Sequence, residues 1–187
     1  MSAIRSPAAA ALEAFATYLD GVLATLDTPP SAVLRGWPET DQGMDLDTGP
    51  VVSITQTGRA EETPVHPSVL GTNATSYNVR TALLTVPMQL DVWARSREAL
   101  DIVTSAVDDA LHNDLPYRPY LYLVATDHQN RPFCVRREGD APDIDGDTAP
   151  TGEWRAIYTL SVEIDRVVGV ELSESVSVSA TVSVTAP

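Results

Sequence analysis

Residues 81 to 94 read TALLTVPMQLDVWA, and residues 96 to 111 read SREALDIVTSAVDDAL. The first run is long, apolar and rich in β-branched residues, which is typical of a strand. In the second run apolar residues recur at steps of three and four, which predicts an amphipathic helix. Ser96 is placed to cap this helix, and Glu98 puts negative charge at its positive end. Because the apolar stripe has no other surface nearby to cover, the helix is expected to fold back onto the sheet.

The flanking segments supply a second helix and further strands. Ser6-Pro7 is a good helix start, and apolar residues at steps of three and four continue from it to Leu26. Strands are expected at residues 32–37, 51–56, 120–124, 133–135 and 154–165. The last of these alternates apolar and polar residues, which is typical of a half-buried antiparallel strand. The pattern therefore predicts an α+β fold, with a mainly antiparallel sheet packed against two main helices.

Two features interrupt this pattern. Residues 57–76 have no apolar period and contain Gly58, Pro64, Pro67 and Gly71. A long loop that projects as an arm or a hairpin tip is expected there. Pro87 lies inside the predicted strand, and because proline cannot donate to a ladder it favours an edge position or a bulge.

The C-terminal end alternates strictly between small apolar and hydroxyl residues. Its apolar positions are Val176, Val178, Ala180, Val182 and Val184, separated by serine and threonine. Such a segment either adds to its own sheet, pairs with a neighbouring subunit by strand addition, or stays disordered. The predicted organisation is one α/β domain at 1–168 followed by an extended β tail at 169–187.

Composition limits the classes of function. The chain has 187 residues and a formal net charge of -14, which weighs against a protein that grips nucleic acid. Cys134 is the single cysteine, so no intrachain disulfide forms. The N-terminal run does not resemble a signal peptide, and no stretch has the roughly 18 consecutive apolar residues needed to span a bilayer. A soluble protein that folds in a reducing cytoplasm is expected.

The sequence offers little to support catalysis. No nucleophile with an activating base, Gly-rich phosphate loop, or CxxC or HExxH pattern occurs, so neither catalytic residues nor a cofactor are predicted. The run from Asp140 to Asp147 places aspartates around Gly146, a pattern that can offer oxygens to calcium. A solvated acidic loop is the favoured interpretation, and a small calcium-dependent or carbohydrate-directed binding module is the alternative.

A few residues are candidates for contacts between subunits. Arg95 and Arg97 flank the predicted helix start in a strongly acidic chain, where they are available to carboxylates of another copy. In the C-terminal segment the candidates are Val176, Val178 and Val182. No metal ligands are assigned.

The order of elements resembles the tail terminator and tail-completion (neck) proteins of long-tailed bacteriophages. The resemblance rests on an N-terminal helix, two strands with a Trp37-Pro38 end, a long loop, and a late strand from Trp154 to Val162. Its most similar part is the junction Leu90-Asp91-Val92-Trp93-Ala94 followed by Arg97-Glu98-Ala99. The likeness covers residues 1–168.

The resemblance implies a virion protein of the tail or neck, assembled in the host cytoplasm as a hexameric ring of identical copies. Such a ring sits on the last ring of tail tube protein, ends tube growth and presents a surface to the head–tail connector or other neck proteins. Acidic residues lining it would let DNA pass without specific binding, and no catalytic residue or membrane contact is implied. The loop at 57–76 and the tail after Gly169 depart from the simplest members of the family. They fit contacts with a neighbour or sheath protein and leave open another neck or baseplate role.

Overall fold

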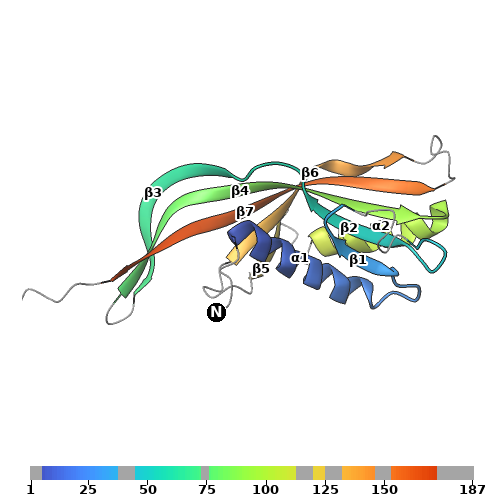
Figure 1. Cartoon of the computed structure of the whole chain (residues 1–187), viewed down its shortest axis with the longest axis horizontal. Coiled ribbons are helices and arrows are strands. Elements are labelled where there is room, and N and C mark those ends of the chain that lie inside the picture. The colour runs from blue at the N-terminus through green and yellow to red at the C-terminus, as the bar shows by residue number, and fades with distance from the viewer. Residues whose placement is uncertain are drawn as a thin grey trace, which may run out of the picture.

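A computed structural model describes residues 6–37, 45–72, 76–112, 120–124, 132–145 and 153–171. Two helices pack against a seven-stranded, mostly antiparallel sheet, so the expected α+β fold is confirmed (Figure 1). The elements are α1 (Pro7–Leu23), β1 (Ala32–Arg35), β2 (Val51–Gln56), β3 (Glu61–Thr72), β4 (Ser76–Ala94), α2 (Arg97–His112), β5 (Tyr120–Val124), β6 (Pro132–Asp145) and β7 (Trp154–Glu171). The strand order is β1-β2-β4-β7-β6-β5, β3 also pairs with β4, and the β1–β2 pair alone is parallel among these pairings.

The central element is β4, a strand of 19 residues. One side of β4 pairs with β7 along its whole length, from Ser76 to Ala94. Its other side pairs with β2 over the second half and with β3 over the first half. The predicted strand at residues 81–94 is therefore confirmed, and it begins five residues earlier, at Ser76.

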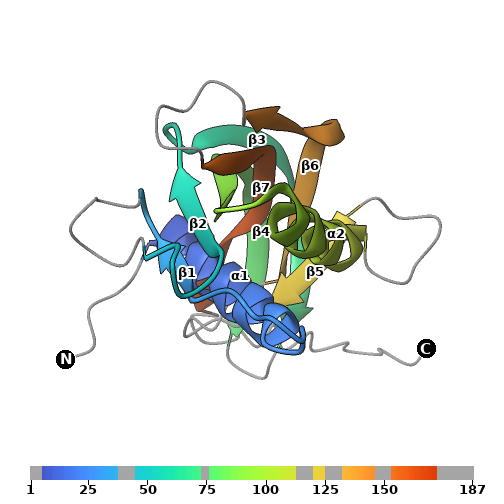
Figure 2. The same cartoon turned by 90° about the vertical axis from the view of Figure 1, so that its right-hand side faces the viewer.

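Both helices cover the same face of the sheet (Figures 1 and 2). Alternate residues of β4 turn towards them and are buried, among them Val86, Leu90 and Val92. The predicted stripe of α2 is buried at Leu100, Val103, Val107, Ala110 and Leu111. The cap is also confirmed, because the Ala99 N–H donates to Ser96 Oγ at 3.2 Å.

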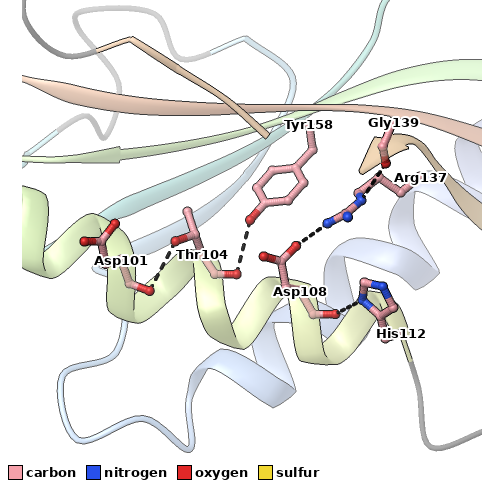
Figure 3. Close-up of polar contacts among 7 residues, drawn as sticks. All are labelled: Asp101, Thr104, Asp108, His112, Arg137, Gly139 and Tyr158. Carbon is pink, nitrogen blue, oxygen red and sulfur yellow. Dashed lines mark hydrogen bonds and ion pairs between the residues drawn. The ribbon is translucent and has the colours of Figure 1, made fainter. Parts of the chain in front are cut away.

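Polar contacts lock α2 onto the sheet (Figure 3). The hydroxyl of Tyr158, on β7, donates to the carbonyl of Thr104 at 3.1 Å. The guanidinium of Arg137, on β6, pairs with Asp108 and donates to the carbonyl of Gly139 at 3.0 Å. Burial, with the nearby Asp108 carboxylate, raises the pKa of Tyr158 above its usual value. The hydroxyl therefore stays protonated and remains a donor at neutral pH.

Pro87 lies where the ladder on one side of β4 is interrupted. β4 is an interior strand and shows no register shift against β7 at this residue, so the expected bulge is wrong, but neither β2 nor β3 pairs with Pro87, so its position is an edge on that side alone. The Thr57 N–H donates to the Pro87 carbonyl at 3.1 Å, in the gap between β2 and β3. Because the N and C=O of one strand residue point to the same side, the missing donor of proline also falls in this gap.

Two predicted loops are largely strand. Residues 57–76 contain β3, which forms a hairpin with β4, so the expected long hairpin is confirmed while most of the loop is not. β6 continues through Gly139 to Asp145, with a register shift between Glu138 and Asp143, so the predicted acidic loop at Asp140 to Asp147 is strand as far as Asp145. β7 runs without interruption to Glu171. The proposed division into 1–168 and 169–187 remains a prediction.

The contact between Gly58 and Pro87 gives a test of the break between β2 and β3. A Cβ atom at Gly58 would lie 2.8 Å from Pro87 Cγ, closer than two carbon atoms pack. We expect Gly58→Ala to lower the free energy of unfolding, measured in urea, by about 1–3 kcal/mol through overpacking. In a Pro87→Ala background the same change should cost clearly less, because the opposing atom is gone. An equal loss of stability in both backgrounds would contradict a steric contact between residue 58 and Pro87.

Candidate functional site: the three-stranded arm

Part of the sheet extends beyond the helices. It consists of β3, β4 up to Thr81, and the end of β7 from Asp165. We call this three-stranded segment the arm. It projects past α1 and α2 and curves towards the side of the sheet on which they lie (Figure 1). The strand pairing that organises the core is thus continued outwards without the helices that cover it there.

Two ion pairs connect the three strands of the arm. Arg80 Nε, on β4, lies 2.6 Å from Asp165 Oδ1 on β7. Arg166, also on β7, pairs with Glu62 of β3 across β4. The hydrogen bond to Glu62 raises the pKa of Arg166. Ion pairs on the surface add little to stability. Their main effect here is that the four charged side chains point to neighbouring strands of the arm.

A row of valines crosses the arm from edge to edge. Val69 of β3 is directly opposite Val79 of β4, which is directly opposite Val168 of β7. Residues directly opposite each other in antiparallel strands share a face, so the three side chains form one row. Val69 is 59% exposed and Val168 is 44% exposed. We call this set the valine row.

The valine row continues the apolar face of the core. Val168 follows Ile164 by four positions along β7, and side chains of a strand return to the same face every second residue. Ile164 is buried in the core under the helices. The register shift near this point, between Arg80 and Ala82, adds its extra residue to β4 and leaves the alternation of β7 intact. The face that α1 and α2 cover in the core is therefore exposed in the arm.

Both long sides of the arm are strand edges. Among the described residues, β3 pairs with β4 alone, and β7 beyond Ile164 also pairs with β4 alone. A strand edge presents backbone N–H and C=O groups that another strand can bind. The arm thus combines an exposed apolar row with backbone hydrogen-bonding groups, which makes it the candidate interaction surface.

The structure places Arg95 and Arg97 at the end of β4 away from the arm. Arg95 pairs with Asp47 at 2.6 Å. Arg97 pairs with Asp101 at 2.8 Å and lies over the ring of Trp154, 5.5 Å from its centroid. Both arginines thus have partners within the chain. The candidates Val176, Val178 and Val182 lie outside the described residues.

Sequence reasoning missed the valine row. Its signal was the run Asp165-Arg166-Val167-Val168-Gly169-Val170, which follows a strand whose apolar alternation was recognised. That run has two valines in succession, so it shows no clean period of two. The pairing of Val69 with Val79 depends on the register shifts in β3, which periodicity does not reveal.

A second polar cluster lies on the sheet face away from the helices. The guanidinium of Arg155 lies 4.4 Å from the ring centroid of Trp93 and 5.1 Å from that of Trp37. It donates from Nε to Asp91 Oδ1 at 2.9 Å, and the Gln89 amide donates to both Asp91 oxygens at 2.9 and 3.0 Å. Asp91 is fully buried. This arrangement compensates a buried carboxylate and fastens the chain after β1 to the sheet, which is a structural role.

The described part of the chain does not assemble a metal or catalytic centre. It contains no group of three or more His, Cys, Asp or Glu residues able to hold a metal ion. Asp143 and Asp145, in the acidic run that was the alternative candidate for calcium binding, are exposed residues of β6. A shallow pocket lies at the start of α2, lined by Thr28, Pro50, Ser96, Glu98, Ala99 and Ile102. No helix in the ranges given above is long and apolar enough to cross a membrane.

The fold and this surface define an α+β protein with a projecting sheet arm. No protein-family model matches the chain, and no curated protein sequence matches it. A similar chain occurs in a solved structure titled "Virion of native gene transfer agent (GTA) particle", with a TM-score of 0.43 and 12% identity, covering 89% of this chain and 100% of that one. A likeness of that strength carries no functional argument.

Cys134 gives a test of the electrostatics on the outer face of the sheet. Burial, followed by the nearby Glu163 carboxylate, raises the pKa of the Cys134 thiol from 9.0 to about 11. At pH 8 the thiolate fraction should be roughly 100-fold lower than for a thiol at 9.0, since two pKa units separate them. Alkylation by iodoacetamide should be slow and should accelerate up to about pH 11. Glu163→Gln should react faster, and an equal rate for both proteins would contradict this assignment.

Proposed function

We propose that this protein is a structural component of a phage-like virion. In this proposal six copies form a ring at the head-proximal end of a tail, where the ring ends tail-tube growth and joins the tail to the head connector. The observation that carries the proposal is the arm, whose valine row is exposed and whose strand edges have no partner among the described residues. A protein that works alone has no use for such a surface and usually guards against it.

The position of the arm favours a ring over a two-fold symmetric dimer. The arm lies at one end of the long β4–β7 ladder, and the start of α2 lies at the other end (Figure 1). At that second end Ile102 is 46% exposed beside the shallow pocket, and Arg95 and Arg97 are nearby. When two different surfaces of identical copies meet, the contact is heterologous and closes as a ring if the rotation allows. Arg95 and Arg97 therefore remain proposed contacts, as do Val176, Val178 and Val182.

The charge of the chain suits a passage for DNA. It has 26 acidic residues and 12 lysines and arginines. A surface with this balance repels phosphates, so a lumen lined by it would conduct DNA without retaining it. The order of elements in the sequence, which resembles phage tail terminators, supports the same role. The proposed partners are tail tube protein and a head connector or neck protein, and the proposed role needs no catalysis.

Assembly with tail tubes tests the proposed function. The purified protein should form a particle of several chains by light scattering, alone or when phage-type tail tubes are added. Electron microscopy should show it as a ring at tube ends, and tubes grown in its presence should be shorter. A protein that stays monomeric and leaves tube length unchanged would refute the proposal.

Substitutions in the valine row test whether the arm makes the contact. The double variant Val69→Asp, Val168→Asp should keep the free energy of unfolding within about 1 kcal/mol, because both side chains are largely exposed. It should fail to form rings, since a charge would be buried at the contact. The matched control Val69→Thr, Val168→Thr keeps the shape of both side chains and should retain assembly. Rings of normal size from the aspartate variant would show that the contact lies elsewhere.

A further inference from the structure

The two edges of the arm are not equivalent. The β3 edge contains Pro64 and Pro67, and the ladder shifts register between Pro64 and Ser68 and again between Val69 and Gly71. Glu61 and Glu62 add exposed charges at its start. Prolines, bulges and charges on an edge strand are the features by which proteins prevent another strand from pairing. The β3 edge is therefore guarded.

The β7 edge lacks these guards. Among the described residues only β4 pairs with β7 from Asp165 to Glu171, and this open part reads DRVVGVE and contains no proline. Its first two charges face partners within the arm, Asp165 with Arg80 and Arg166 with Glu62. Four uncharged residues, Val167 to Val170, follow them. From Val167 to Val170 the edge can therefore accept a strand without desolvating a charged side chain.

The direction of the backbone groups along this edge can be assigned. The Thr81 hydroxyl, on β4, donates to the carbonyl of Arg166 at 3.3 Å. The backbone groups of Arg166 thus face β4. Because successive residues of a strand direct their N–H and C=O groups to alternate sides, those of Val167 face the open edge. The backbone N–H and C=O of Val167 are therefore available to form hydrogen bonds with an added strand.

A suitable strand is present in the sequence of the same protein. Residues 172–187 follow β7 directly and carry the valine–serine alternation from Val176 to Val184. Seven residues at about 3.4 Å each match the open edge from Asp165 to Glu171, and 16 are available. Between Glu171 and Ala186 there is no Gly, Asn, Asp or Pro. Without these residues a tight turn that returns the segment to its own β7 is unfavourable.

We propose that the open edge of β7, from Asp165 to Glu171, binds the C-terminal segment of a second copy as an added strand. Main-chain hydrogen bonds form the contact, and valines of the incoming segment extend the valine row onto a fourth strand. Each copy donates at its C-terminus and accepts on β7, so the contact is heterologous. The inference rests on the proposed function, because it supplies the contact between copies of the ring.

Complementation between two full-length variants tests this contact. Val167→Pro removes an N–H on the open edge and leaves the groups facing β4 in place, so it blocks the acceptor. Val178→Pro interrupts the donor segment. Each variant alone should be monomeric by light scattering, while Val167→Ala and Val178→Ala, which keep the N–H, should assemble normally. Mixed together, the two proline variants should give particles of two chains and nothing larger, since one copy only donates and the other only accepts.

Several outcomes would overturn the inference. Wild-type assembly of either proline variant alone would place the contact elsewhere. Edges that pair with each other would show as assembly of Val178→Pro alone, and a mixture that stays monomeric would show that the segment and the open edge do not bind each other between copies. Val178→Pro controls for misfolding of the arm, because it leaves the sequence of β7 unchanged. Backbone hydrogen exchange at residues 165–171 should be slow in assembled wild type and fast in this variant, which lacks the added strand. If the proline variants still cap tail tubes, the inference fails and the proposed function stands; if two-chain particles form but wild type ignores tubes, the reverse holds.

Discussion

The pairing of β4 with β7 is the constraint on which the rest of the structure depends. It runs from Ser76 to Ala94 on one strand and from Trp154 to Glu171 on the other. Over one half the paired strands have helices beneath them and form the core, and over the other half they carry only β3 at their side. Core and arm are therefore parts of one continuous ladder.

Much of the core could be predicted because its residues meet a single local requirement. The stripe of α2, its cap at Ser96 and the alternation of β7 after Tyr158 are repeated patterns within one segment, and the structure confirms each. Periodicity of this kind reports which face is buried, whatever covers it. It does not report which strands are neighbours, so the order β1-β2-β4-β7-β6-β5 could not be read from the sequence.

The arm was only partly predictable, for a related physical reason. Pro64, Pro67 and Gly71 disfavour a regular strand, and taken alone they indicate a loop. In the structure they are tolerated because β3 is an edge strand that shifts register twice. Pro87 is accepted in an interior strand because β2 ends where its missing donor would be needed. Each of these residues is explained by a neighbouring strand that is distant in sequence.

The strand alternation of the core and the exposure of the arm have the same origin. Ile164 and Val168 lie on one face of one strand, yet Ile164 is buried in the core and Val168 is 44% exposed, because Val168 belongs to the arm, which projects past the helices (Figure 1). Burying this face is favourable wherever a cover is available, and the folded chain has no third helix in its described part to supply one. In the proposed assembly the cover would be the C-terminal segment of a second copy, whose sequence alternates valine and serine and has one charged residue, Glu174, between Leu172 and Pro187. The open edge of β7 would then extend the sheet of one chain with a strand from the next, so that the same pairing that forms the fold also forms the assembly.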